Sequence, residues 1–267
     1  MSRIKACFDT LQKNNKKALV PFITAGDPDP TVTVSLMHDL VSSGADIIEL
    51  GMPFSDPMAD GPVIQRASER ALANGTTTDD VFRMVMEFRS NNDTTPIILM
   101  GYLNPIEVMG YEVFSEEAAK VGVDGVLVVD LPPEEASEFN AIFRKHGLDQ
   151  IYLLSPTTGG NRLDKICEVA SGFLYYVSLK GVTGSDRLDT GAVASKLDEI
   201  RNKTSLPLGV GFGIKDTEIA KEVSKISDAV IIGSALVERI AKFADDNETM
   251  RDEIKMFVSS LRTALDS

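Results

Sequence analysis

The sequence contains no tryptophan, only two cysteines, and no long hydrophobic run. Its longest apolar runs are Ala18 to Thr24, Gly125 to Val129 and Ala229 to Ile232, whereas a membrane-spanning helix needs about 20 consecutive apolar residues. The first residues, Met-Ser-Arg-Ile-Lys-Ala-Cys-Phe, lack the apolar core of an export signal. These absences argue against a membrane or exported protein, and we expect a cytoplasmic one.

Cysteine and histidine are both too sparse to suggest a metal site. Cys7 and Cys167 lie in helix-like segments without metal-ligand spacing, so reduced, half-buried thiols are favoured over a disulfide or a nucleophile. His38 and His146 lie within or at the end of expected helices, and we expect both at the surface. The sequence therefore predicts no metal ion.

Basic residues are in the minority, with 27 Lys and Arg against 40 Asp and Glu and a formal net charge of −13. A nucleic-acid-binding surface needs clustered Lys and Arg to neutralise phosphates, which argues against that class. Because the overall field repels anions, any phosphate ligand must be held by local donors.

The pattern that is present is an alternation of short apolar runs with segments of helical period, typical of parallel βα units. With 267 residues, 43% of them apolar, the chain is long enough for one large domain spanning residues 1–267. We expect eight strands: Ala18 to Thr24, Asp46 to Leu50, Ile97 to Gly101, Gly125 to Val129, Ile151 to Leu154, Phe173 to Val177, Leu208 to Gly211, and Ala229 to Ile232.

Eight such units predict an α/β fold of the (β/α)8 TIM barrel type, with its active site at the carboxyl ends of the strands. An open, doubly wound sheet is the alternative, but no Gly-x-Gly-x-x-Gly follows the first strand. Helix starts are expected at Asp29-Pro30, at 130–135, at Asp216 and at 245–248. An extra N-terminal helix with an apolar stripe (Ile4, Cys7, Phe8, Leu11) could cover the bottom of the barrel.

Glu49 is the strongest catalytic candidate, because it directly follows two isoleucines at the end of an expected strand. Burial disfavours a carboxylate and raises its pKa, which suits a group that gives and takes a proton near neutrality. The alternative is a structural carboxylate bound by a neighbouring Lys or by backbone amides.

Asp60 follows in a loop of Gly, Pro and Met, and two interpretations of it remain open. It could be a second catalytic carboxylate, but Asp60-Gly61-Pro62 also has the form of a helix N-cap. The spacing does not decide between them.

Glycine-containing turns follow the last three expected strands, at Lys180 to Gly184, Gly211 to Ile214 and Gly233 to Ala235. Phosphate sites of barrels commonly use the last loops and a helix N-terminus, where backbone N–H groups approach the anion. The turns therefore predict a phosphate-bearing ligand, with the hydroxyl of Ser234 as an extra donor.

Several longer motifs resemble one family, the tryptophan synthase alpha subunits, in order along nearly the whole chain. They are Pro21-Phe-Ile-Thr-Ala-Gly-Asp-Pro28, Glu49-Leu-Gly-x-Pro-Phe-Ser-Asp-Pro57, Ala59-Asp-Gly-Pro62, Met100-Gly-Tyr-x-Asn-Pro105, Gly181-Val-Thr-Gly184, Gly211-Phe-Gly213 and Gly233-Ser234. The resemblance implies a lyase that reversibly cleaves indole-3-glycerol phosphate to indole and glyceraldehyde 3-phosphate. It also implies a beta subunit in an alpha2beta2 complex, with pyridoxal phosphate in that partner and no cofactor in this chain.

The resemblance also assigns residues. Glu49 and Asp60 match the catalytic carboxylates, and the phosphate cradle is matched by Gly184, Gly213, Gly233 and Ser234. Positions that line or close the indole pocket are matched by Phe22, Tyr102, Tyr175, Thr183 and Phe212, with Met100 beside them at the same rim. The absence of tryptophan fits an enzyme that is made when tryptophan is scarce.

One departure from the family lies in the sixth loop, where Leu179-Lys180 stands in place of a sequence that often contains Arg. Lys cannot replace the bidentate contacts of Arg. By resemblance, the 52–58 loop and the Asn104-Pro105 turn are expected to meet the beta subunit. Another phosphate-handling barrel and a catalytically idle binding subunit remain as alternatives, and the Glu49 to Asp60 block disfavours both.

Overall fold

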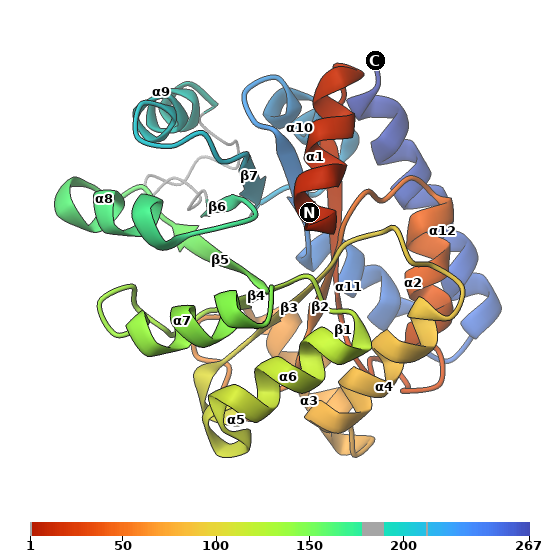
Figure 1. Cartoon of the computed structure of the whole chain (residues 1–267). Helices are drawn as coiled ribbons and strands as arrows, with labels where there is room; N and C mark the ends of the chain where they lie inside the picture. The colour runs from red at the N-terminus through yellow and green to blue at the C-terminus, as the bar shows by residue number, and fades with distance from the viewer. Residues whose placement is uncertain (1, 178–189, 212) are drawn as a thin grey trace.

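Eight parallel strands form a closed barrel in this computed structural model, which describes residues 2–177, 190–211 and 213–267 (Figure 1). Each strand pairs with the next in sequence, and β1 closes the barrel against β8. The strands are β1 (Ala18–Thr24), β2 (Ile48–Gly51), β3 (Ile97–Gly101), β4 (Gly125–Val128), β5 (Asp149–Leu154), β6 (Leu174–Val177), β7 (Leu208–Gly211) and β8 (Ala229–Ile232). The predicted (β/α)8 barrel is confirmed.

The helices surround the strands (Figure 1), and within the described residues they are α1 (Arg3–Lys13), α2 (Thr33–Ser42), α3 (Pro62–Ala73), α4 (Thr78–Arg89), α5 (Leu103–Met109), α6 (Tyr111–Val121), α7 (Ser137–Lys145), α8 (Gly160–Val169), α9 (Thr190–Arg201), α10 (Thr217–Ser224), α11 (Ser234–Lys242) and α12 (Asn247–Leu265). None of these helices combines the length and the apolar character needed to cross a membrane.

The strands bury side chains on both faces, as their continuous apolar runs predict. Alternate residues point outward into a shell shared with the helices, and the others fill the barrel interior. Phe22 on β1 lies beside Glu49 on β2, which in turn lies beside Ile98 on β3. The two-residue period therefore places Glu49 on the interior face.

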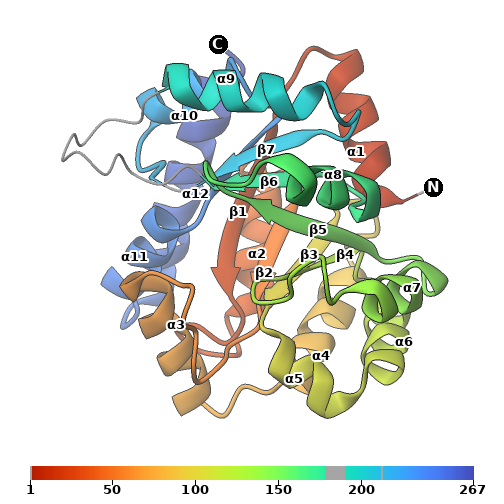
Figure 2. The same cartoon turned by 90° about the vertical axis from the view of Figure 1, so that its left-hand side faces the viewer.

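Helix α1 closes the amino-terminal end of the barrel, as its apolar stripe predicts. Ile4 and Phe8 are buried in the same cluster as interior residues of the strands, among them Ile47 and Ile151. The Phe8 ring packs against Phe173, with ring centroids 5.8 Å apart. Figure 2 shows α1 at the opposite end of the barrel from α3 and α11.

The carboxylates at this amino-terminal end are paired. Asp46, Asp124 and Asp228 each precede a strand, and each accepts a hydrogen bond from a backbone N–H of a neighbouring strand at 2.8 or 2.9 Å. Each also forms an ion pair, with Arg262, Arg89 and Arg201 respectively. The aspartates thereby tie the strand starts to the surrounding helices.

Several predicted element ends are wrong by a few residues. β2 begins at Ile48 rather than Asp46, because the Asp46 side chain bonds Leu19 N–H and Arg262. The helix expected at Asp29-Pro30 begins at Thr33. That expected at 130–135 begins only at Ser137, whereas the starts near Asp216 and Asp246 are confirmed.

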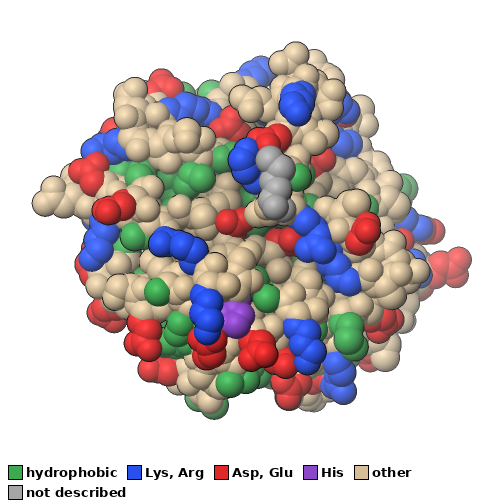
Figure 3. All heavy atoms as spheres, in the orientation of Figure 1, with side chains coloured by type: hydrophobic (Ala, Val, Ile, Leu, Met, Phe, Trp, Pro, Cys, Tyr) green, Lys and Arg blue, Asp and Glu red, His purple; other side chains and the backbone are tan. Residues whose placement is uncertain are grey.

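The surface and the sparse residues agree in most respects with expectation. Acidic and basic side chains are interspersed over the face shown in Figure 3. Cys7 and Cys167 are half-buried free thiols. His38 and His146 are half-buried rather than fully exposed, since the His38 ring stacks on Phe88 and His146 contacts Glu112.

Candidate active site

Glu49 is a buried carboxyl group at the carboxyl end of the barrel, with only 1% of its surface exposed. Its Oε1 atom has no hydrogen-bond partner among the described residues. Burial, and secondarily the negative charge of Asp60, raises the pKa of Glu49 to about 8. The group therefore carries a proton at neutral pH and can both donate and accept one.

Asp60 lies in the loop between β2 and α3, and the structure contradicts its interpretation as a helix N-cap. The N-cap of α3 is Gly61, and Pro62 is the first helical residue. The Asp60 side chain turns instead to the barrel mouth, where its Oδ2 accepts a hydrogen bond from the Tyr102 hydroxyl at 3.0 Å. Burial raises the pKa of Asp60 above its ordinary value, and the hydrogen bond from Tyr102 offsets only part of this rise.

Tyr102 joins β3 to the loop that carries Asp60. Its hydroxyl oxygen accepts a hydrogen bond from the Ala59 N–H at 3.0 Å while its proton goes to Asp60. The ring stacks on Phe54, with centroids 5.3 Å apart, and burial raises the pKa of the hydroxyl. Tyr102 therefore fixes both the backbone and the carboxylate of the loop.

A hollow opens at this end of the barrel between the first four strands and α3. Four of the predicted site residues, Phe22, Asp60, Met100 and Tyr102, line it together. Glu49 lies deeper in the barrel interior, two residues before Gly51, which also lines the hollow. The two carboxylates thus face one region from different depths.

Tyr175 lies in the interior rather than along this hollow. Burial, followed by the charges of Glu49 and Asp60, raises the pKa of its hydroxyl well above the ordinary value. A Cβ at Gly211 would lie 2.4 Å from the Tyr175 hydroxyl oxygen. Only glycine fits there while the tyrosine keeps this position.

Three of the four predicted phosphate residues, Gly213, Gly233 and Ser234, belong to the described part of the structure and follow β7 and β8 at the same end of the barrel. Gly213 follows β7 with φ of +77°, a conformation that favours glycine. Gly233 is the N-cap of α11 and Ser234 is its first residue, and a Cβ at Gly233 would lie 3.6 Å from Phe22. Thr183, Gly184 and Phe212, with Leu179 and Lys180, lie outside the described residues.

Several residues outside the predicted site set also line the hollow, namely Thr24, Gly51, Met52, Ile64, Ser68, Gly101 and Val129. Thr24 ends β1 on the same strand face as Phe22, so its position at the mouth could be predicted from the sequence, although no role was predicted for it. Its Oγ1 is buried without a hydrogen-bond partner in the described part of the chain. Ile64 and Ser68 come from α3, whose packing across the mouth no local pattern reveals.

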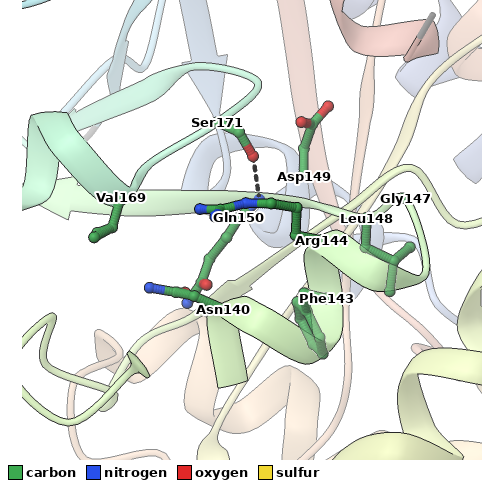
Figure 4. A pocket seen from close by; sticks show the side chains of 9 residues that line it. All are labelled: Asn140, Phe143, Arg144, Gly147, Leu148, Asp149, Gln150, Val169 and Ser171. Atoms are coloured by element: carbon green, nitrogen blue, oxygen red, sulfur yellow. Dashed lines mark hydrogen bonds between the residues drawn. The ribbon is translucent and has the colours of Figure 1, made fainter. Parts of the chain in front are cut away.

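A second hollow lies at the other end of the barrel (Figure 4). It is lined by the end of α7, the start of β5 and Ser171, which accepts a hydrogen bond from the Gln150 N–H at 2.9 Å. The active sites of (β/α)8 barrels lie at the carboxyl end of the strands, so this second hollow at the amino-terminal end is not a candidate for the active site. No group of three or more His, Cys, Asp or Glu within the described residues could hold a metal ion.

Comparison with known proteins gives a consistent result over the whole chain. Residues 8–266 match the family model described as tryptophan synthase alpha chain. The chain is 56% identical to the tryptophan synthase alpha chain of Thioalkalivibrio sulfidiphilus, and the match covers 100% of both chains. It is 54% identical to that of Nitrosococcus oceani, with 100% and 98% covered.

Solved structures agree with the sequence match. Tryptophan synthase subunit alpha from Legionella pneumophila is 48% identical with a TM-score of 0.93, and the alignment covers 100% of this chain and 99% of that one. Tryptophan synthase of Mycobacterium tuberculosis is 33% identical with a TM-score of 0.89, and 99% and 98% are covered. The chain therefore belongs to the tryptophan synthase alpha chain family, a family of lyases.

Proposed function

We propose that Glu49 and Asp60 carry out the family reaction in this chain, the reversible cleavage of indole-3-glycerol phosphate to indole and glyceraldehyde 3-phosphate. The observation that carries the proposal is the pair itself. A buried Glu49 with its pKa raised to about 8 lies at the same end of the barrel as Asp60, which lines the hollow there and accepts a hydrogen bond from Tyr102. Two carboxylates in unlike environments divide the acid and base roles.

Glu49 supplies the proton transfers. An indolyl carbanion is a very poor leaving group, so the ring carbon must be protonated before the carbon–carbon bond breaks. Protonated Glu49 donates that proton, and its carboxylate then takes the proton of the glycerol hydroxyl as the aldehyde forms. Its burial keeps water away from the intermediate.

Asp60 stabilises the charge that develops on the ring. Of the two carboxylates it is the more exposed and the one with a hydroxyl donor, which favours its ionised form. As positive charge develops on the indole nitrogen, the N–H bonds an Asp60 oxygen. Phe22 and Met100, which line the same hollow, provide apolar surface for the ring.

The phosphate end of the substrate is placed by Gly213, Gly233 and Ser234, with Gly184 as a further expected donor. The N–H groups at the start of a helix lack carbonyl partners one turn earlier and attract an anion, and in α11 these are the N–H groups of Ser234 and Ala235. Anchoring one end on fixed backbone groups orients the other end against Glu49. Thr183, Phe212 and Tyr175 complete the proposed pocket.

A beta subunit is the expected partner, in an alpha2beta2 complex whose beta subunits carry pyridoxal phosphate. Two exposed apolar side chains, Met58 and Val108, lie in the segments after β2 and β3, and each is 82% exposed. Asn104 is also exposed, whereas Met52 is buried against Gly101. Asn104 and Pro105 lie in the first turn of α5 rather than in a turn of the loop. The proposed contact surface therefore includes Met58 and this start of α5 but not Met52.

The test is indole release from indole-3-glycerol phosphate, followed with the purified chain alone and with a beta subunit. We expect release in both cases. Absence of turnover in both would overturn the proposal. Ligand binding without turnover would instead identify a catalytically idle binding subunit.

A further inference from the structure

The segment that carries Asp60 is held from two sides. Tyr102 holds it on the β3 side through Ala59 N–H and the Asp60 carboxylate. On the α3 side, the side chain of Gln65 in the first turn of the helix contacts the segment. No role in the reaction has been assigned above to Gln65, and its side chain does not line the hollow.

The Gln65 side chain reaches back along its own helix to the loop. Its amide nitrogen donates to the carbonyl oxygen of Asp60 at 3.0 Å and to that of Pro57 at 3.3 Å. The Asp60 N–H also donates to Pro57 O, at 3.0 Å. One side-chain amide thus connects both ends of the turn 57–60.

The helix that carries Gln65 is itself fixed in place. Arg70, one and a half turns further along α3, donates two hydrogen bonds to Asp27 at 2.7 and 3.0 Å, and Asp27 is 1% exposed. Ala67 is buried together with Phe22 and Val237. Gln65 therefore transmits the position of a rigid element to the loop.

The chemistry of the contact requires an amide. Both acceptors are carbonyl oxygens, and a glutamine NH2 group offers two donors without a charge. A glutamate of the same shape would present oxygens to those carbonyls and would repel the carboxylate of Asp60. A methionine would keep the length of the side chain and remove both donors.

We propose that Gln65 is a positioning residue for the reaction, which holds the Asp60 backbone so that the Asp60 carboxylate meets the indole nitrogen in the transition state. The inference rests on the proposed role of Asp60. Gln65 itself touches neither substrate nor reacting atoms. Its loss should lower the rate of cleavage more than the affinity for substrate, because the contact with the nitrogen strengthens as charge develops.

The experiment compares Gln65→Met with Arg66→Met, an exposed neighbour on the same helix turn, in steady-state indole release. For Gln65→Met we expect kcat to fall on the order of 10-fold with KM changed less than about 3-fold, because a small misplacement of a reacting group is enough for such a loss. Arg66→Met should keep the wild-type kcat. Thermal unfolding of both variants shows that the compared proteins are folded.

A double-mutant cycle distinguishes positioning of Asp60 by Gln65 from a general destabilisation of the loop. In an Asp60→Asn background, Gln65→Met should lower the remaining rate by less than about 2-fold, because the group that Gln65 positions has been altered. An undiminished loss in that background, or a wild-type kcat in Gln65→Met, overturns the inference. A wild-type rate in Asp60→Asn alone overturns instead the proposed role of Asp60.

Discussion

The two ends of the barrel use the same chemical group in opposite ways. At the amino-terminal end, Asp124 is almost fully buried but is bonded by Arg3, by Arg89 and by the Ile97 N–H. At the carboxyl end, Glu49 is just as buried but has one oxygen without any donor in the described structure. The Asp60 carboxylate accepts a hydrogen bond from the Tyr102 hydroxyl and has no Arg or Lys partner among the described residues.

The difference shows what separates a structural carboxylate from a reactive one in this fold. A carboxylate with Arg and N–H partners is stable as an ion and stabilises the elements it connects. A buried carboxylate without them holds a proton at neutral pH. Burial alone does not distinguish the two ends, and the presence of donors does.

The largest expected effect is on catalysis, from Glu49→Gln. This variant keeps the shape of the side chain but cannot transfer a proton, and general acid–base catalysis contributes about 10²–10⁴-fold. We expect indole release to fall by at least about 10³-fold, with phosphate-ligand binding largely retained. Glu116→Gln, an exposed glutamate on α6, is the control. Loss of ligand binding together with turnover would indicate a structural role for Glu49.

The converse change at the other end is Asp124→Ala. It leaves the Arg89 guanidinium, whose side chain is 10% exposed, without its buried partner. We expect the free energy of unfolding to fall by about 3 kcal/mol, measured by urea denaturation, while kcat of the folded enzyme stays within about 2-fold. Glu116→Ala is the matched control. A large fall in kcat with unchanged stability would contradict the division between the two ends.

The pH dependence of stability tests whether the buried Glu49, whose Oε1 atom has no hydrogen-bond donor in the described part of the chain, keeps its proton in the folded protein. Between the ordinary pKa of 4.5 and the raised pKa of about 8, the unfolded Glu49 loses its proton while the folded one keeps it. The free energy of unfolding should therefore fall as pH rises through this range, by up to about 1.4 kcal/mol per pH unit. Glu49→Gln cannot lose this proton, so its free energy of unfolding should lack this fall with pH in urea titrations. The difference in free energy of unfolding between the variant and the wild type should therefore shift in favour of the variant as pH rises to about 8. Parallel curves would show that Glu49 is ionised in the folded protein.

The smallest expected effect is from Tyr102→Phe. This change removes the hydroxyl that donates a hydrogen bond to Asp60 and accepts one from the Ala59 N–H. Hydrogen bonds to charged groups contribute roughly 1.5–3 kcal/mol, so kcat should fall on the order of 10-fold. The ring and its contact with Phe54 remain. Steady-state kinetics check the effect, with Tyr111→Phe on α6 as the control. An unchanged kcat would mean that the hydroxyl does not act on Asp60.

Most of the barrel could be predicted from the sequence, because each strand is a short apolar run with turn residues at its ends. The bounds of β1, β3, β7 and β8 agree with the predicted runs. The start of β2 could not be predicted, because the bond between Asp46 and Leu19 N–H forms only when β2 lies beside β1, 27 residues away in sequence.

Helix starts were harder to predict, because an aspartate side chain can accept hydrogen bonds either from the first N–H groups of a helix or within a preceding turn. Asp29 accepts from the Thr31 N–H and hydroxyl, so it closes a turn rather than capping α2. After β4, Glu135 N–H bonds Pro132 O in another turn, and α7 starts later.

The site shows the same limit. Glu49 could be located from its strand, but the role of Asp60 could not be decided, since its partner Tyr102 is 42 residues away in sequence. Gln65 carries no local signal at all. Its two acceptors are backbone oxygens, whose positions depend on the fold of the loop and not on the identity of nearby side chains.

Helix α1 covers the amino-terminal end of the barrel. With Ile4 and Phe8 packed into the amino-terminal end, Glu49 communicates with solvent through the mouth that the substrate itself fills. A proton taken up by Glu49 during turnover is therefore sheltered from exchange until product leaves. In the cleavage direction the hydrogen that reaches the ring carbon is then the one that Glu49 already held when substrate bound, and the hydroxyl proton stays on Glu49 until product leaves.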